Sequence, residues 1–379
     1  MRIPVVDNQH RPLMPTKPSR ARKWIRLGKA IAKFNDLGQF YVQLLGEASG
    51  IDTQNIVIGI DPGKLYSGIG VQSSKVTLFT AHLMLPFQKV TDRMEQRAMM
   101  RRTRRGRRIN RKVAFNKRAH RQKRFDNRSS SKLPPSIRAN RQLELRVVSE
   151  LCKVFPVNNI VYEIVEAKGD KSFSPVMVGQ KWMLTQLAYF AAVETQKGWE
   201  TSLVRTQLGL HKQKHSKGDA IPATHAVDGV ALSASAFIDY GVINRHSMGW
   251  KGKVAITPAP FTIIRRPPIS RRQLHLMAPA VGGLRRKYGG TTTRHGFRKS
   301  DYVEATQGKK TYRGWVSGDT ETQVSVSDVS WKRLGQFTAR KVRLIRRSTG
   351  LIITAIKIAC VMFTLSAEAT EFPHSHQVL

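Results

Sequence analysis

The sequence is short of cysteine, of acidic residues and of long hydrophobic runs. Its two cysteines, Cys152 and Cys360, lie far apart in apolar surroundings, which excludes a disulfide framework and a CxxC zinc site. Residues 1–22 are polar and rich in proline, so they predict no signal peptide. Residues 351–365 form the longest apolar run, but Lys357 interrupts it and a membrane span needs about 20 residues. We expect a cytoplasmic protein of a reducing compartment with no membrane partner.

Acidic residues are few in comparison with basic ones. The 379 residues include 65 Lys and Arg and only 25 Asp and Glu, which gives a net charge of +40 and a pI near 11.1. Solubility needs far less charge, and such a chain repels itself without counter-ions, so we expect a polyanionic partner. An anionic membrane is the competing partner, but it requires a hydrophobic face beside the basic one. Composition therefore favours nucleic acid.

Much of this charge lies in residues 100–128, which hold a single acid, Asp126. On a helix the cations of this run point in every direction, so no apolar face remains for packing on a protein core. A charge run is usually a solvated tail, but this one is internal and mainly arginine, whose planar group binds phosphate through two hydrogen bonds. We expect a nucleic-acid-binding helix. Its candidate contacts are Arg101, Arg102, Arg104, Arg105, Arg107, Arg108, Arg111, Lys112, Arg118, Arg121 and Arg124.

Apolar runs on both sides of this segment predict an α/β domain that the basic helix interrupts. Residues 56–60 are continuously apolar and end at a turn, which is typical of a strand buried on both faces. Farther along the chain, apolar residues that alternate with polar ones predict strands, and apolar residues three or four positions apart predict helices. We expect strands at residues 56–60, 66–71, 76–79, 160–165 and 200–205, and helices at residues 143–154, 181–197 and 222–240. This order of elements is that of an RNase H-like domain.

The two ends of the chain differ from this domain in the pattern of their apolar and basic residues. Residues 1–50 form a small basic segment with a turn-like stretch at residues 11–15. Beyond residue 253, short apolar stretches broken by Gly and Pro predict a small barrel or sheet. These stretches are residues 254–256, 262–264, 324–326, 342–345 and 351–354. This C-terminal module also carries candidate nucleic-acid contacts at Arg271, Arg272, Arg285 and Arg286.

Three acids interrupt runs that are otherwise apolar: Asp61, Glu163 and Asp228. An unpaired carboxylate in such surroundings costs several kcal/mol, so each needs a cation or a proton. Pairing with arginine is the ordinary explanation for any one of them. Three acids in matching buried contexts favour a shared metal site, and hard oxygen ligands select Mg²⁺ or Mn²⁺. Two such ions, about 3.5 to 4 Å apart, would stabilise both oxygens of a phosphodiester displacement.

Other polar residues bear on this site. His225 lies three residues before Asp228, on the same face of a helix, and we expect it to move a proton or to contact the scissile phosphate. Two alternatives stay open. Glu166 could replace Glu163, and His215 with Asp219 forms a looser pair in a basic loop.

The ordered motifs resemble the split RuvC motifs and bridge helix of transposon-encoded RNA-guided nucleases of the IscB and IsrB group. An N-terminal segment resembles the PLMP element of that group, and two basic segments resemble its C-terminal region. The matching segments, which span most of residues 11–354, are Pro12-Leu13-Met14-Pro15, Gly59-Ile60-Asp61-Pro62-Gly63, Val161-Tyr162-Glu163-Ile164, His225-Ala226-Val227-Asp228, Arg271-Arg272-Gln273-Leu274-His275 and Arg285-Arg286-Lys287-Tyr288-Gly289-Gly290-Thr291.

One departure selects a family within this group. IscB carries an HNH nuclease between the second and third RuvC motifs, whereas here residues 164–224 hold no His-Asn-His pattern. The chain therefore resembles IsrB, which implies a nickase with one RuvC site formed by Asp61, Glu163, His225 and Asp228. The resemblance also implies Mg²⁺, a long structured omega RNA as guide, and cleavage of the displaced non-target strand of DNA beside a flanking motif. It implies a monomeric protein in a ribonucleoprotein of the prokaryotic cytoplasm.

The resemblance also divides the chain. It implies a PLMP-type segment (1–50), RuvC part I (51–90), the bridge helix (91–130), RuvC parts II and III (131–245), a β-rich module for RNA or the flanking motif (246–355) and a tail (356–379). Two other functions stay open. A ribosomal-type RNA-binding protein explains the charge but not the buried acids, and a guide-free RuvC-like resolvase explains the acids but not the basic helix.

Overall fold

The computed structural model describes residues 1–107, 112–117, 133–166, 174–213, 220–244, 247–269 and 291–356. The chain forms two compact units. Unit 1 combines Met1–Leu85, Ile137–Arg265 and Ile353–Leu379, and unit 2 combines Pro86–Ser136 and Arg266–Ile352. In the described residues, no helix is both long and apolar enough to cross a membrane.

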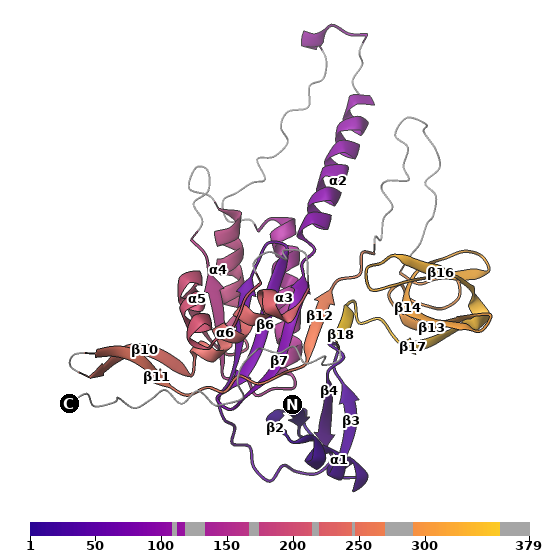
Figure 1. The fold of residues 1–379 in the computed structure, drawn as a ribbon. Coiled ribbons are helices and arrows are strands. Elements are labelled where there is room, and N and C mark those ends of the chain that lie inside the picture. Colours follow the sequence, from indigo (N-terminus) through magenta and orange to yellow (C-terminus); the bar gives the residue numbers. More distant parts are fainter. Residues whose placement is uncertain are drawn as a thin grey trace. The chain divides into compact units, whose positions relative to one another are not determined.

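A seven-stranded sheet forms the centre of unit 1 (Figure 1). Its order is β18-β12-β7-β6-β5-β8-β9. Strand β6 runs antiparallel to both β5 and β7, whereas the pairs β5–β8, β8–β9 and β7–β12 are parallel. The strands are β5 (Ile56–Pro62), β6 (Tyr66–Ser73), β7 (Val76–Met84), β8 (Asn159–Ile164), β9 (Ala192–Lys197), β12 (Phe261–Arg265) and β18 (Ile352–Ile356). The expected α/β class is confirmed.

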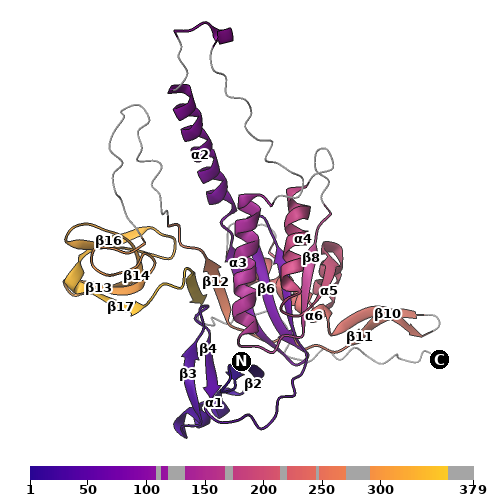
Figure 2. The same cartoon turned by 180° about the vertical axis from the view of Figure 1, so that it is seen from behind.

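Helices cover both faces of this sheet, with α6 (Val227–Ser235) on one face and α3 (Pro135–Cys152) on the other (Figures 1 and 2). The contact of α6 with β5 and β6 depends on glycine. A Cβ atom at Gly70 would lie 2.6 Å from the backbone of Gly229, and one at Gly59 would lie 2.1 Å from the Gly229 carbonyl oxygen. Only glycine allows such close approach of two backbones. The helix therefore lies directly on the strands.

The predictions for residues 181–207 were wrong. The helix expected at residues 181–197 is α4 (Pro175–Leu187), which is followed by β9. The strand expected at residues 200–205 is instead α5 (Gly198–Gln207). Strand β9 is at the edge of the sheet and mostly exposed, so its sequence lacks the apolar run of a buried strand. Glu200 caps the first turn of α5, because its carboxylate accepts a hydrogen bond from the backbone amide of Lys197 at 2.5 Å.

The helix expected at residues 222–240 begins as predicted but ends early. A π-helical turn, η3 (Pro222–Ala226), leads into α6, which ends at Ser235. The chain then forms a two-stranded antiparallel hairpin of β10 (Ile238–Asn244) and β11 (Ser247–Gly252). The root of the hairpin belongs to the core, because Ile238 is buried with Val230, Ala234 and Val254.

The small basic N-terminal segment forms a four-stranded sheet. Its order is β2-β1-β4-β3, with strands β1 (Ile3–Val6), β2 (Pro12–Thr16), β3 (Ala30–Phe34) and β4 (Phe40–Leu44), and helix α1 (Pro18–Arg26) lies between β2 and β3 in the chain. The turn expected at residues 11–15 was wrong. These residues are mostly part of β2, whose two prolines are accommodated because it is an edge strand.

Unit 2 contains a helix and a separate five-stranded sheet. Helix α2 (Phe87–Arg107) includes the start of the basic run, and a turn with η1 (Phe115–Lys117) replaces the continuous helix that we expected there. The sheet has the order β16-β15-β14-β13-β17. Its strands are β13 (Tyr302–Gln307), β14 (Lys310–Asp319), β15 (Gln323–Ser327), β16 (Arg333–Thr338) and β17 (Val342–Arg346), with η5 (Ala339–Lys341) before the last.

Three expectations for the C-terminal module were wrong. Residues 254–256 form no strand, and Val254 is buried in the core around α6. The stretches at residues 262–264 and 351–354 are strands, but β12 and β18 extend the seven-stranded sheet of unit 1. Strand β12 lies between β18 and β7, whereas β18 is at the edge of this sheet. A local sequence pattern does not show which sheet a strand joins. The strands at residues 324–326 and 342–345 are confirmed as β15 and β17.

Candidate metal centre

Asp61 and Glu163 are brought together by the register of two parallel strands. Strand β5 pairs with β8 so that Gly59 is opposite Val161 and Ile60 is opposite Tyr162. Because side chains alternate along a strand, Gly59, Asp61, Val161 and Glu163 point to one face. Gly59 touches α6, so this face is the one that α6 covers. The two acids therefore lie side by side at the carboxyl ends of their strands.

Helix α6 and the π-helical turn before it supply the other two residues. His225 Nδ1 lies 2.8 Å from Asp61 Oδ2. Asp61, His225 and Asp228 each offer one ligand atom, and these atoms lie within 4.8 Å of one another. A Cβ at Gly68 would lie 1.7 Å from the His225 carbonyl oxygen, so this turn rests on β6 as closely as α6 does. Two segments far apart in sequence, the end of β5 and the junction of η3 with α6, thus meet in one group that could hold a metal ion.

Asp228 also has cationic partners. Its Oδ1 accepts a hydrogen bond from Arg205 of α5 at 2.6 Å, and its Oδ2 accepts one from Lys212. Burial and the charge of Asp61 raise the pKa of Asp228, whereas Lys212 and Arg205 oppose that shift. The ordinary explanation of a buried acid, pairing with a cation, therefore applies to Asp228. The same Asp228 also belongs to the group with Asp61 and His225.

Glu163 differs from Asp228 in its partners, because the positive charge of Lys212 opposes the rise of its pKa without forming an ion pair in the described part of the chain. Within the described residues it forms no ion pair, and its hydrogen-bond partner is the Thr201 hydroxyl. Burial, followed by the charges of Asp61 and Asp228, raises its pKa to about 7. A carboxyl group held so close to neutral pH is a mark of functional sites, since it is desolvated beside other acids. A divalent cation would remove this cost, so the donor set fits a metal ion.

A buried network on the opposite face of the sheet fixes the turn that follows Asp61. Arg141 of α3 contacts Glu144 at 2.6 Å, the Tyr162 hydroxyl at 3.0 Å and the Gly63 carbonyl oxygen at 3.2 Å. Glu144 is fully buried, and burial raises its pKa although Arg141 lowers it. On the Asp61 side of the turn, the Ser67 hydroxyl donates to the Asp61 carbonyl oxygen at 2.7 Å. Asp61 thus lies on a braced segment of backbone.

Two rings pack around His225. His82 of β7 and Tyr66 of β6 lie with ring centroids 5.8 and 5.9 Å from that of His225. His82 is 1% exposed, and burial with the neighbouring His225 lowers its pKa to about 4. It is therefore neutral at physiological pH. The Thr224 hydroxyl lies 3.3 Å from His82 Nδ1, which ties the π-helical turn to β7.

The alternative residues fall outside this group. Glu166 is exposed and forms an ion pair with Lys197 at 3.1 Å. His215 and Asp219 lie outside the described residues. The structure therefore places Glu163, and not Glu166, beside Asp61.

The basic residues named from the sequence are only partly described. Arg101 and Arg102 are exposed on α2, and Arg104, Arg105 and Arg107 lie in the same helix. Lys112 is exposed in the turn before η1. The remaining candidates lie outside the described residues and are Arg108, Arg111, Arg118, Arg121, Arg124, Arg271, Arg272, Arg285 and Arg286.

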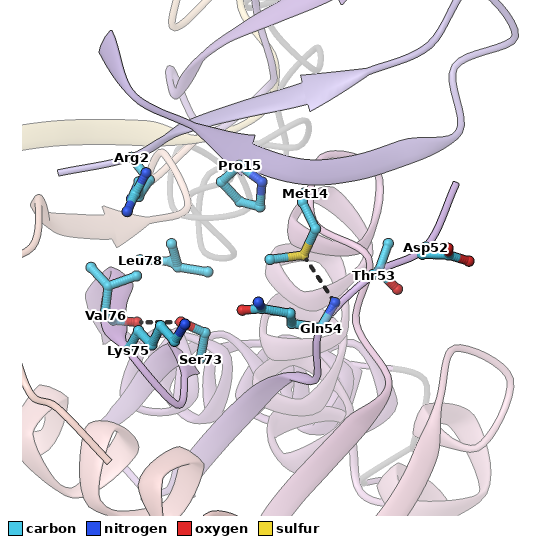
Figure 3. A pocket seen from close by; sticks show the side chains of 10 residues that line it. All are labelled: Arg2, Met14, Pro15, Asp52, Thr53, Gln54, Ser73, Lys75, Val76 and Leu78. Atoms are coloured by element: carbon cyan, nitrogen blue, oxygen red, sulfur yellow. Dashed lines mark hydrogen bonds between the residues drawn. The ribbon is translucent and has the colours of Figure 1, made fainter. Parts of the chain in front are cut away.

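A separate pocket lies at the other end of the same strands (Figure 3). It has a volume of about 510 Å³ and is lined by Met14 and Pro15 of β2, by Gln54, by Lys75 of the β6–β7 turn and by Val76 at the start of β7. The backbone amide of Gln54 donates a hydrogen bond to the sulfur of Met14 at 3.3 Å. Ile56 pairs with Ser73 at this end, whereas Asp61 pairs with Gly68 at the other. The pocket is thus not part of the acidic group.

Sequence reasoning missed several residues of the site. Arg205 was expected in a strand, and Lys212 lies in a loop without any pattern. Glu144 carried a usable signal, because it is an acid within the apolar series of α3, next to Leu143 and Val147. That is the same signal that identified Asp61.

Comparisons with known proteins give distant structural similarity and one family match. The chain is similar to the structure titled "T. thermophilus RuvC in complex with Holliday junction substrate", with 13% identity over 48% of this chain and 90% of that chain and a TM-score of 0.26. It is also similar to "Thermus thermophilus RuvC structure", with 14% identity over 47% and 90% and a TM-score of 0.23. Curated proteins give no match.

The family match covers a little under half of the chain. The matched residues include Arg101-Arg102-Thr103-Arg104-Arg105, two pairs of arginines separated by one residue. Residues 3–181 match the model of the family described as RRXRR protein, and the name states this same arrangement.

Proposed function

We propose that this protein is an RNA-guided DNA nickase of the IsrB kind. In this proposal an omega RNA pairs with one strand of the target, and the site around Asp61 cuts the displaced strand. The protein acts as a monomer within a ribonucleoprotein in the prokaryotic cytoplasm. Base pairing supplies sequence specificity, while the protein binds the backbone and a short flanking motif.

The observation that carries the proposal is the meeting of Asp61, His225 and Asp228 within 4.8 Å, with Glu163 on the next strand. Non-catalytic proteins have no need to gather acids in a site where burial and then mutual repulsion raise the pKa of one carboxyl, that of Glu163, to about 7. The strand order β7-β6-β5-β8-β9 with β6 reversed, and the placement of the acids at strand ends, also support an RNase H-like site.

The residues of such a site would have three roles: metal binding, proton transfer and phosphate contact. Asp61, Glu163 and Asp228 would hold Mg²⁺ or Mn²⁺, and His225 is a further donor. A bound ion supplies a nucleophile at neutral pH and stabilises the charge of the phosphodiester in the transition state. His225, held by Asp61 and packed between two rings, is placed to move a proton at Nε2. Arg205 and Lys212 are close enough to Asp228 to contact a phosphate that enters the site.

The other parts of the chain take the roles that the sequence suggests. The arginine-rich run from α2 onward would bind RNA and heteroduplex phosphates as a bridge helix. The N-terminal sheet would be the PLMP element, and the five-stranded sheet would contact RNA or the flanking motif. One acidic group among the described residues accounts for cutting one strand.

The ion pairs of Asp228 favour a second candidate, a non-catalytic RNA-binding protein in which Arg205 and Lys212 neutralise that acid permanently. The two functions differ in whether the acidic group is needed for any reaction on DNA.

The test is to sequence RNA that copurifies with the chain and to incubate the complex with Mg²⁺ and matching duplex DNA. We expect a nick in the displaced strand, lost in Asp61→Asn, Glu163→Gln and Asp228→Asn while RNA binding is unchanged. Glu166→Gln is the matched control, because it removes an exposed acid three residues from Glu163. Undiminished nicking in Asp61→Asn would reject the site, and absence of any metal-dependent cut would favour the RNA-binding protein.

A further inference from the structure

The β10–β11 hairpin extends beyond α6 as a two-stranded ribbon (Figures 1 and 2), and one of its faces is apolar and exposed among the described residues. Tyr240 is paired with Trp250 and Val242 with Met248, so these four side chains share one face of the ribbon. Tyr240, Val242 and Met248 are each more than half exposed. The opposite face carries the pairs Asp239 with Lys251 and Gly241 with Gly249. The face with Tyr240 and Trp250 is thus apolar, whereas the pair of Asp239 and Lys251 lies on the other.

The hairpin is fixed to the helix that carries Asp228. Ile238 is buried in the core around α6, and Trp250 packs against the same core. The Phe237 amide donates to Ala234 of α6 at 2.9 Å, and the Lys253 amide donates to the Phe237 carbonyl oxygen at 3.2 Å. With a rise of about 1.5 Å per helical residue and about 3.4 Å per strand residue, Asp228 and Tyr240 are at most about 26 Å apart. A strand of nucleic acid held at one reaches the other within a few nucleotides.

We propose that this face is a platform on which unpaired bases of single-stranded DNA stack as the strand leaves the metal site. The inference rests on the proposed function, since it takes the bound strand to be the one that is cut. Tyr240 offers an exposed ring, Trp250 stands beside it with centroids 5.4 Å apart, and Val242 and Met248 extend the apolar surface toward the tip. Aromatic platforms of this kind bind any base, because every base has a flat apolar face.

The charge around the platform and its small area favour single-stranded DNA as the molecule that binds there. The platform itself carries no acid, Lys251 and Lys253 are exposed at the root, and the whole chain has a net charge of +40, which suits a polyanion. A protein partner needs about 800 Å² on each side for a specific interface, and four side chains on one face of a two-stranded ribbon provide less. Duplex DNA hides its base faces in the stack, so only unpaired bases can use the platform.

The first test is photocrosslinking of the full-length chain to an oligo(dT) strand with one 5-iododeoxyuridine, followed by mapping of the crosslinked peptide. We expect the crosslink within residues 238–252 and expect Tyr240→Leu to remove it. Leucine keeps the apolar character and suits the strand while removing the ring. The matched control is Tyr189→Leu, since Tyr189 is 80% exposed elsewhere in unit 1, and we expect its crosslinking to equal that of the wild type.

The second measurement is the dissociation constant for oligo(dT) as a function of salt. Loss of one stacked base should raise it by about 5- to 150-fold in Tyr240→Leu. The slope against salt should stay unchanged, because that slope counts phosphate contacts. An unchanged dissociation constant, or crosslinks only outside residues 238–252, would overturn the platform.

Two further arms separate the alternatives. Crosslinking to 5-iodouridine RNA but not to the DNA strand, or self-association that Tyr240→Leu abolishes, would also overturn the proposal. Nicking is measured in the same preparations. A wild-type chain that crosslinks through the hairpin but does not nick would refute the proposed nickase alone, and one that nicks without the crosslink would refute the platform alone.

Discussion

Replacing Glu163 by glutamine should stabilise the metal-free protein, although it should destroy the site. Glu163 lies beside Asp61 and Asp228, has no cationic partner among the described residues, and has a pKa of about 7 where 4.5 is ordinary. Between these two pH values the folded protein keeps a proton that the unfolded chain has released. The free energy of unfolding of the wild type therefore falls as pH rises from about 4.5 to about 7. Glutamine carries no charge and avoids this loss.

The magnitude follows from the shift. Each pKa unit corresponds to about 1.4 kcal/mol, and solvent screening of a partly buried group reduces the total, so we expect about 2 kcal/mol at pH 8. For a folding unit of this size that is about 4 to 8 °C in Tm. The assay is thermal unfolding of wild type and Glu163→Gln in EDTA between pH 5 and pH 8. The gain should be largest at pH 8 and should shrink toward pH 5.

Glu166→Gln is the control, and it should shift Tm by less than about 1 °C at any pH because its carboxylate is exposed. Added Mg²⁺ should reverse the order of wild type and Glu163→Gln, since only the complete site binds it tightly. If Glu163→Gln is less stable than wild type at pH 8 in EDTA, or if its gain does not depend on pH, the repulsion argument for this site is wrong.

Three further predictions concern the surroundings of the acids. Arg141→Ala should lower the free energy of unfolding by about 3 to 5 kcal/mol in chemical denaturation, because Glu144 then stays buried without its partner; a loss below 1 kcal/mol would contradict the network. Gly70→Ala should cost about 1 to 3 kcal/mol and weaken Mg²⁺ binding in calorimetry, since its methyl group displaces α6; unchanged binding would mean that α6 does not position the site. Lys212→Ala should lower the Mg²⁺ concentration that gives half-maximal stabilisation, because Lys212 no longer competes for Asp228; a higher concentration would show that the lysine supports the ion.

The acids could be predicted from the sequence because a charge in an apolar run is unusual wherever the chain folds. Asp61, Glu163 and Asp228 each interrupt a stretch that has to be buried, and that cost is visible without coordinates. The three strands before the basic run were predictable because they are rich in apolar and β-branched residues, and residues 56–60 of β5 are continuously apolar. Burial of a strand can therefore be predicted from the residues of that strand alone.

What depends on distant contacts could not be predicted. Strand β12 pairs with β7 in a register that joins Phe261 to Thr80, and its own sequence does not indicate that distant partner. Arg205 and Lys212 reach Asp228 from a helix and a loop whose patterns are ordinary. Gly70 and Gly229 matter because they touch each other, and either one alone is an unremarked glycine. The hairpin after α6 was missed because the apolar spacing of the helix continues into β10.

The most direct test of the metal centre is anomalous diffraction from crystals of the full-length chain soaked in Mn²⁺. The account predicts anomalous peaks in contact with the carboxylates of Asp61 and Asp228 and next to Glu163, with Lys212 displaced from Asp228. Crystals in which Arg205 and Lys212 stay on Asp228 at saturating Mn²⁺, with no peak beside Asp61, would contradict it.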